Sequence, residues 1–188
     1  CIRDSSKSCW YHLYQISKIR RYLTTEQAKS VIHAYVTSRL DQNNSLLLGL
    51  PKKSLRCLQC IQNACAKLIV DGKKHDHVTP ILISLHWLPV EQRIIFKVLL
   101  LAFKALNEKG PTYLKNALVP YTPARSLRSA NTKMLCTPKT HYVDTQKRAF
   151  SIRAPAEWNL LPMDLKNCNT VNSFKSKLKT YLFKVAYK

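Results

Sequence analysis

The chain has 188 residues, and its 31 Lys and Arg residues against 10 Asp and Glu residues give a formal net charge of +21. An excess of this size bears on association rather than on fold, and it predicts a polyanionic partner. The carboxylates are scattered, and the two closest in sequence are Asp71 and Asp76. Phosphoryl transfer with two metal ions needs several carboxylates around ions about 3.5–4 Å apart. The sequence therefore does not suggest nuclease or polymerase chemistry.

Composition excludes several other classes. Three glycines are too few for a phosphate-binding loop or a dinucleotide fingerprint, which need clustered glycines. The longest apolar run, Val98–Phe103, is far shorter than the roughly 18 residues of a membrane span. No apolar segment of a secretion signal follows Cys1, so we expect an intracellular protein, nuclear or cytoplasmic. The start at a cysteine instead of methionine suggests either a processed chain or, more simply, a piece of a longer one.

Seven cysteines without a secretion signal predict a reducing compartment. Cys57, Cys60 and Cys65 have a spacing that could belong to a zinc site, or they could be small apolar residues on a helix. No second C-x-x-C and no H-x-x-x-H completes a standard ligand set. The apolar interpretation is therefore favoured, and no metal or cofactor is expected.

The sequence pattern of residues 1–72 predicts three helices with short connections, and such helices form a small bundle. The first helix runs from Ser5 to Arg21, the second starts at a capping box of Thr24 and Gln27, and the third runs from Lys53 to Val70. Residues expected to face the core at helical spacing are Trp10, Leu13, Tyr14 and Ser17 in the first helix, Ala28, Val31, Ile32, Tyr35 and Val36 in the second, and Leu55, Leu58, Ile61, Cys65 and Ile69 in the third.

Residues 73–188 predict a helical C-terminal region after an exposed basic loop at Gly72–His77. Its strongest helix is Val90–Asn107, and a basic, proline-interrupted loop spans residues 120–147. Met134–Thr137 and Arg148–Arg153 have the composition of short strands that could pair as a β-hairpin. A terminal amphipathic helix has Phe174, Leu178, Tyr181, Leu182 and Val185 facing the core, and Lys175, Lys177, Lys179 and Lys184 facing out. The expected fold class is mainly α.

Segments over nearly the whole chain together carry a family resemblance. They are Thr37–Asp41, Gly49–Pro51, Leu58-Gln59, Gln62–Ala64, Thr79-Pro80, Leu85–Val90, Arg148–Ser151, Ala154-Pro155, Trp158–Pro162 and Ser173–Phe183. In this order they resemble the region after the palm in LINE-type (non-LTR) retrotransposon reverse transcriptases, especially jockey-like elements. The resemblance implies that residues 1–72 form the polymerase thumb and that the rest lies beyond it.

The resemblance also implies that the palm and the endonuclease lie upstream in the parent polyprotein, which would be an RNA-directed DNA polymerase. The chain contains no Asp-Asp pair, so no catalytic residue of the family is carried over and the fragment is not expected to be an enzyme. Asp41–Asn44 and Val143–Gln146 depart from the family pattern by losing an aromatic residue and a glycine at turns, which suggests relaxed constraint. The family usually has an aliphatic residue at Cys60 and alanine at Cys65, which favours the apolar interpretation.

We therefore expect a non-catalytic nucleic-acid-binding fragment that contacts the phosphates of RNA, DNA or an RNA–DNA hybrid. The candidate contacts are Lys18, Arg20, Arg21, Lys52, Lys53, Arg56, Lys73, Lys74, Arg125, Arg128, Lys139, Lys147 and Arg148. Tyr121 and Tyr142 are candidates for stacking on unpaired bases, whereas Trp10, Trp87 and Trp158 are expected in the core. The alternatives are a basic helical module for a protein or a membrane surface, and an inert remnant of a truncated element.

Overall fold

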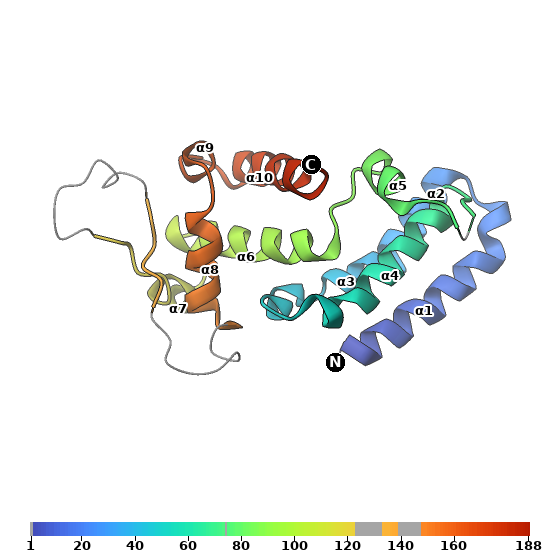
Figure 1. The fold of residues 1–188 in the computed structure, drawn as a ribbon, viewed down its shortest axis with the longest axis horizontal. Helices are drawn as coiled ribbons and strands as arrows, with labels where there is room; N and C mark the ends of the chain where they lie inside the picture. Colours follow the sequence, from blue (N-terminus) through green and yellow to red (C-terminus); the bar gives the residue numbers. More distant parts are fainter. Residues whose placement is uncertain (1, 74, 123–132, 139–147) are drawn as a thin grey trace. The chain divides into compact units, whose positions relative to one another are not determined.

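A computed structural model describes residues 2–73, 75–122, 133–138 and 148–188 (Figure 1). These residues are mainly α-helical, as predicted. In chain order the elements are α1 (Ile2–Ile19), η1 (Arg20–Tyr22), α2 (Thr25–Ile32), η2 (His33–Thr37), α3 (Ser38–Asp41), η3 (Asn44–Leu47), α4 (Lys52–Ile69), α5 (Val78–Ser84), α6 (Val90–Leu106), α7 (Thr112–Asn116), α8 (Phe150–Asn159), α9 (Met163–Lys166) and α10 (Val171–Ala186).

The chain divides into two compact units. The first comprises Cys1–Leu46, Leu50–Arg93 and Val185–Lys188, and the second comprises Leu47–Gly49 and Ile94–Lys184. The sequence predicts a domain boundary at residue 72, which falls between α4 and α5. The division into domains 1–72 and 73–188 stays a prediction.

The first unit contains the predicted bundle of α1, α4 and the helical segment made of α2, η2 and α3. The capping box is confirmed: the Thr24 hydroxyl accepts from the Gln27 amide, and the Gln27 side chain accepts from the Thr24 amide. The predicted core face of α4 is confirmed as well, since all five of its residues are buried. In the second helical segment Ala28, Ile32 and Val36 are fully buried, whereas Tyr35 is 54% exposed. Its predicted place in the core was wrong.

The predicted core face of α1 was partly wrong. Trp10 and Tyr14 are 46% and 60% exposed, and Ser17 is exposed as well. The buried residues are Ser6, Cys9, Leu13 and Ile16. The physical reason is the close approach of neighbouring elements. The Ser6 hydroxyl lies 2.9 Å from the Cys57 thiol, and the Cys9 thiol lies 3.9 Å from the Val36 carbonyl. Small side chains permit this approach, whereas the large rings fit only on the outside.

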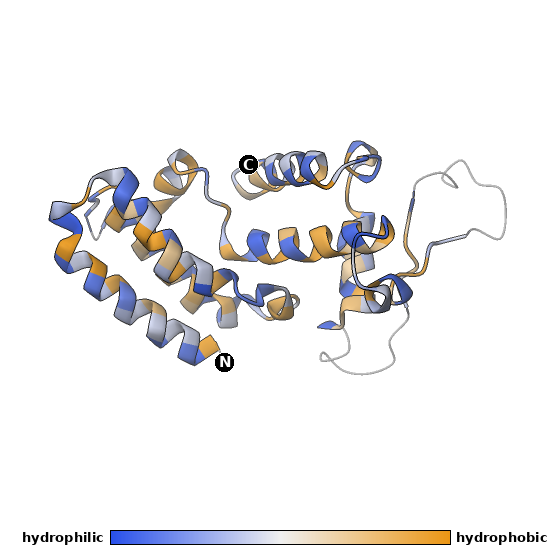
Figure 2. Cartoon of the chain, turned by 180° about the vertical axis from the view of Figure 1, so that it is seen from behind, coloured by the Kyte–Doolittle hydropathy of each residue, from blue (hydrophilic) through white to orange (hydrophobic). Residues whose placement is uncertain are grey.

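Helices α1 and α4 lie side by side and run parallel (Figures 1 and 2). Ser6 meets Cys57 near the start of both helices. At the other end the Arg20 guanidinium donates to the carbonyls of Leu68 and Ile69, each at 2.8 Å. Both N-termini therefore lie at the same end of the bundle.

Three hydrogen bonds fix the segment from Trp87 to Val90 within the first unit. The Gln59 side chain accepts from the Val90 amide at 2.9 Å, and the Gln62 side chain donates to the Leu88 carbonyl at 2.8 Å. The Tyr187 hydroxyl donates to the Trp87 carbonyl at 2.6 Å. Trp87 is half-buried, and the third tryptophan, Trp158, is only 2% exposed, as its predicted place in the core requires.

The second unit is built around α6 and α10. Within α6, Ile94, Val98, Leu99, Ala102 and Phe103 are at most 2% exposed, as the predicted helix pattern requires. The rings of Phe103 and Phe174 stack with their centroids 4.1 Å apart. On α10, Phe174, Leu178 and Leu182 are buried and the four lysines are exposed, as predicted, whereas Val185 is 47% exposed. Figure 2 shows hydrophobic and hydrophilic residues alternating along these helices.

The predicted pairing of Met134–Thr137 with Arg148–Arg153 was wrong. Phe150 begins α8 instead, where Ala154 and Trp158 are one helical turn apart on a buried face. Leu135 forms an antiparallel bridge with Pro120. Around this bridge the Tyr121 amide donates to the Met134 carbonyl at 2.9 Å, and the Cys136 amide donates to the Val119 carbonyl at 2.8 Å. Burying the Trp158 ring outweighs the local strand preference of the segment.

Candidate nucleic-acid interface

A row of cationic and aromatic side chains lies on the exposed face of the first helix, and we call it the basic-aromatic stripe. It consists of Lys7, Tyr11, Tyr14 and Lys18 of α1 with Arg21 and Tyr22 of η1. At 100° per residue the four α1 residues fall within an arc of about 60°, centred about 150° from the buried face. The same amphipathic pattern that buries Cys9 and Leu13 therefore turns the stripe to solvent.

The three tyrosines of the stripe are strongly exposed, and two of them, Tyr14 and Tyr22, contact cations of the stripe. Tyr11, Tyr14 and Tyr22 are 59%, 60% and 73% exposed. The Lys18 ammonium lies 4.4 Å from the ring centroid of Tyr14, and the Arg21 guanidinium lies 4.9 Å from that of Tyr22. Cation–π contacts of this kind contribute about 0.5–1 kcal/mol at exposed sites. Each places a positive charge beside an aromatic face that stays open to solvent.

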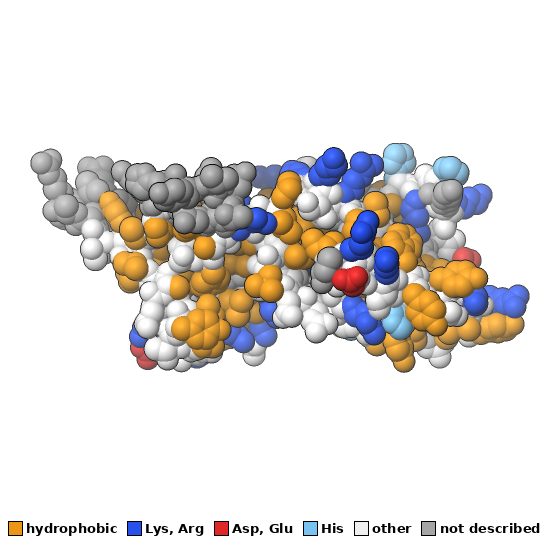
Figure 3. All heavy atoms as spheres, turned by 90° about the horizontal axis from the view of Figure 1, so that it is seen from below, with side chains coloured by type: hydrophobic (Ala, Val, Ile, Leu, Met, Phe, Trp, Pro, Cys, Tyr) orange, Lys and Arg blue, Asp and Glu red, His pale blue; other side chains and the backbone are white. Residues whose placement is uncertain are grey.

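The aromatic surface continues from the stripe onto the neighbouring helical segment. The His12 ring lies 5.5 Å from the Tyr11 ring and 5.7 Å from the ring of Tyr35, centroid to centroid. Tyr35 belongs to the π-helical turn η2, and such turns often occur at functional sites. Figure 3 shows apolar side chains beside Lys and Arg side chains over the part of the molecule that contains α1.

Two of the predicted phosphate contacts lie in the stripe, and a third forms hydrogen bonds with backbone carbonyls of the first unit. Lys18 and Arg21 are exposed. The half-buried Arg20 guanidinium donates three hydrogen bonds of 2.8 Å, to the carbonyls of Leu23, Leu68 and Ile69. Arg20 thus joins the end of α1 to the end of α4, and only part of its donor capacity is left for a phosphate.

A second exposed group of predicted contacts lies at the start of α4. Arg56 follows Lys52 by four residues and Lys53 by three, so it is a neighbour of each lysine on the surface of the helix. Lys52 lies 4.0 Å from Glu91, but its side chain is 87% exposed, so this ion pair constrains it little. Because α1 and α4 run parallel, these cations lie at the end of the bundle where α1 begins, and Lys18 and Arg21 lie at the other end.

The remaining predicted contacts are dispersed. Lys73 is exposed after α4, and Arg148 is exposed just before α8. Gly49 adopts φ +77°, and a Cβ there would lie 2.9 Å from Cγ of Arg148, so this glycine permits a close approach to the arginine side chain. Tyr121 is 48% exposed, as a stacking candidate should be. The other candidates, Lys74, Arg125, Arg128, Lys139, Tyr142 and Lys147, lie outside the described residues.

Lys7, Tyr11, Tyr14 and Tyr22 were not predicted from the sequence as residues of a binding surface. The available signal was the alternating spacing of four and three between positions 7, 11, 14 and 18, which predicts one narrow helical face. That face competed with the more hydrophobic pattern of Trp10, Leu13 and Tyr14. The two alternatives differ only in which neighbouring arc of the helix packs inward.

The described part of the chain contains no group of three or more His, Cys, Asp or Glu side chains that could hold a metal ion. Cys57 and Cys60 are exposed on α4, whereas Cys65 is 1% exposed. Burial raises the pKa of the Cys65 thiol to about 12. Its neutral thiol is therefore an apolar core side chain at physiological pH.

Comparisons with family models, with curated proteins and with solved structures found no match to this chain. Among the residues that the structure describes, none of the helices combines the length and the apolar character needed to cross a membrane. The functional assignment therefore depends on the sequence resemblance and on the surfaces described above.

Proposed function

We propose that this chain is a non-catalytic nucleic-acid-binding fragment of a LINE-type retrotransposon reverse transcriptase, formed by the thumb and the region beyond it. It contacts the phosphates of RNA, DNA or an RNA–DNA hybrid through exposed Lys and Arg side chains. The palm of the parent polyprotein, an RNA-directed DNA polymerase, is the protein partner that the resemblance implies. The proposed location is intracellular.

The basic-aromatic stripe is the observation that supports this proposal most. Nucleic-acid surfaces that bind single strands combine cations for the backbone with exposed aromatic rings for the bases. The stripe offers both on one helical face, and no carboxylate belongs to it. A solvated face that served only for solubility would not need three strongly exposed tyrosines.

The membrane-surface and protein-docking alternative finds less support. It requires the Lys-rich α10 to present its apolar face to a partner. Phe174, Leu178 and Leu182 of that face are at most 4% exposed, because they pack inside the second unit. What α10 presents is mainly a row of solvated lysines, with Val185 as its one strongly exposed large hydrophobic residue among those described.

The test is fluorescence anisotropy of the chain with labelled single-stranded RNA, single-stranded DNA and an RNA–DNA hybrid, with anionic vesicles as the competing surface. Salt is varied from about 50 to 200 mM, because each phosphate contact adds about 0.7–0.9 to the slope of log K against log salt. Six exposed cations of the first unit (Lys7, Lys18, Arg21, Lys52, Lys53 and Arg56) predict a slope of about −4 to −5. Preference for vesicles, or no binding to any nucleic acid, would refute the proposal.

A matched pair of triple variants locates the interface. Lys7→Gln/Lys18→Gln/Arg21→Gln removes three charges from the stripe, and Lys175→Gln/Lys177→Gln/Lys179→Gln removes three from the exposed side of α10. The stripe variant should reduce the salt slope by about 2 to 3, whereas the α10 variant should leave it nearly unchanged. Equal losses in both variants would mean that net charge alone, without a defined surface, drives the binding.

A further inference from the structure

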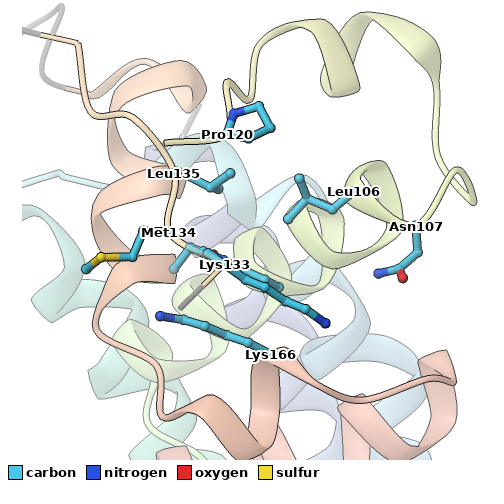
Figure 4. A pocket seen from close by; sticks show the side chains of 8 residues that line it. Leu106, Asn107, Pro120, Lys133, Met134, Leu135 and Lys166 are labelled. Carbon is cyan, nitrogen blue, oxygen red and sulfur yellow. The ribbon is translucent and has the colours of Figure 1, made fainter. Parts of the chain in front are cut away.

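The second unit contains a cavity of about 280 Å³, open to solvent on one side, that the proposed function does not use (Figure 4). It lies between the end of α6, the Pro120–Leu135 bridge, the end of α8 and the end of α9. Its apolar lining includes Leu106, Pro120, Leu135 and Trp158, and its cationic lining is Lys133 and Lys166. Ligand sites in proteins have this composition, with mainly apolar walls and a few polar groups.

Hydrogen bonds to α8 hold one wall of the cavity in place. The Asn159 side chain forms both bonds with the backbone of Leu135: its oxygen accepts from the amide, and its nitrogen donates to the carbonyl, each at 2.9 Å. The Trp158 indole donates to the Lys133 carbonyl at 3.0 Å. Because the side chains of Trp158 and Asn159 on α8 fix the segment from Lys133 to Leu135, the cavity is preformed before any ligand arrives.

Lys166 is the feature of the cavity that needs an explanation. It is only 5% exposed, and its ammonium donates to the Asn159 carbonyl at 3.2 Å. Burial lowers the pKa of this lysine, because desolvation disfavours its charged form. Among the described residues it forms no ion pair, and no lining residue carries a carboxylate. A buried ammonium is normally paired with an anion or with several acceptors.

We propose that this cavity binds a small organic phosphate, with the phosphate group at Lys166 and a flat apolar body against Leu106, Pro120 and Trp158. Lys133 also lines the cavity and is exposed, and its long flexible side chain can bring a second charge to the phosphate. A phosphate monoester carries a charge of about −1.5 to −2 at pH 7, which matches two ammonium groups better than a carboxylate does. The proposal does not depend on the basic-aromatic stripe.

Phenyl phosphate is the probe, and the Trp158 indole N–H is the reporter. Titration of the full chain labelled with ¹⁵N is followed by NMR, in which each of the three tryptophans gives one indole signal. The variants Trp10→Phe and Trp87→Phe remove the other two signals and so assign that of Trp158. We expect a saturable shift of this signal with phenyl phosphate, and binding at least tenfold weaker with inorganic phosphate, phenol and benzoate. The comparison of phenyl phosphate with inorganic phosphate and with phenol thus separates the contribution of the ring from that of the phosphate group.

Lys166→Met is the decisive variant, because methionine has a similar length and removes a buried charge, so the fold should persist. We expect at least tenfold weaker phenyl phosphate binding, since a charge-assisted hydrogen bond is lost. Lys133→Met, at an exposed position, should also weaken binding, and Lys177→Met on α10 should not. No saturable shift of the Trp158 signal, or unchanged affinity in Lys166→Met, would overturn the proposal. Benzoate binding as tight as that of phenyl phosphate would overturn the assignment to a phosphate.

Discussion

Arg20→Gln should destabilise the first unit strongly, although Arg20 belongs to a run of basic residues that looks like a surface cluster in the sequence. Its guanidinium donates at 2.8 Å to the carbonyls of Leu68 and Ile69, in the last turn of α4, and to that of Leu23. Carbonyls at the end of a helix lack intrahelical partners, and the end of the helix dipole is negative there. Arg20 supplies both the missing donors and a positive charge.

The expected loss follows from the count of these bonds. Three hydrogen bonds contribute about 1 kcal/mol each, with a further 0.5 kcal/mol or so from the dipole. The glutamine amide can restore roughly one of the bonds. Since Arg20 is half-buried and water can reach part of the site, the net loss in the free energy of unfolding should be about 2 kcal/mol.

Urea unfolding followed by far-ultraviolet circular dichroism measures this loss. With a slope of about 2 kcal/mol per molar urea, the midpoint should fall by about 1 M. The matched control is Arg21→Gln, one residue later, where the exposed side chain contacts the Tyr22 ring. Its midpoint should change by less than about 0.25 M, which corresponds to the usual surface effect of about 0.5 kcal/mol. If both variants lost the same stability, the assignment of Arg20 as a link between helices would be wrong.

Three further predictions concern the interface, the core and an ion pair. Tyr11→Ala/Tyr14→Ala should weaken the binding of single strands by about 1–3 kcal/mol per lost base stack and affect the binding of duplexes less. Anisotropy assays with single-stranded and duplex probes measure the difference. Helix α1 should persist in this variant because alanine favours helix. Above pH 9 the Cys65 thiol ionises in the unfolded chain, whereas in the folded chain, with its pKa of about 12, it stays protonated. The free energy of unfolding should therefore fall with rising pH by up to about 1.4 kcal/mol per pH unit. In urea unfolding at pH 8 and pH 10, the variant Cys65→Ala should show a smaller fall than the unchanged chain. A double-mutant cycle of Arg93→Met and Asp41→Asn should give a coupling of about 1 kcal/mol, because the two side chains form a partly exposed ion pair with two hydrogen bonds.

Strong helical patterns made much of the fold predictable from the sequence. The core faces of α4 and α6 and the buried part of α10 follow from runs in which large aliphatic or aromatic residues recur every three or four positions. The capping box at Thr24 follows from local chemistry alone, since donor and acceptor are three residues apart. Such features depend little on the rest of the chain.

The features that the sequence did not predict depend on tertiary contacts. In α1 the buried face is chosen by how closely Ser6 and Cys9 let Cys57 and Val36 approach, and no periodicity reports that distance. Likewise nothing local distinguishes Arg20 from Arg21, because only the position of the last turn of α4 decides which of them finds carbonyls. The burial of Lys166 is another case, since a single lysine in a short helix reads as a surface residue.

The buried face of α1 contributes to stability, and the opposite face carries the proposed binding residues. Cys9, Leu13 and Ile16 hold the helix against the bundle, and the Arg20 guanidinium fixes its end, so these residues orient everything on the opposite face. The stripe residues contribute little to packing, because their side chains are exposed. Changes on the inner face should therefore reduce binding only in proportion to the fraction of unfolded chain, whereas changes in the stripe should reduce binding at unchanged stability. A net charge of +21 cannot predict this division, since it counts Arg20, whose guanidinium binds three carbonyls, together with the exposed cations of the stripe.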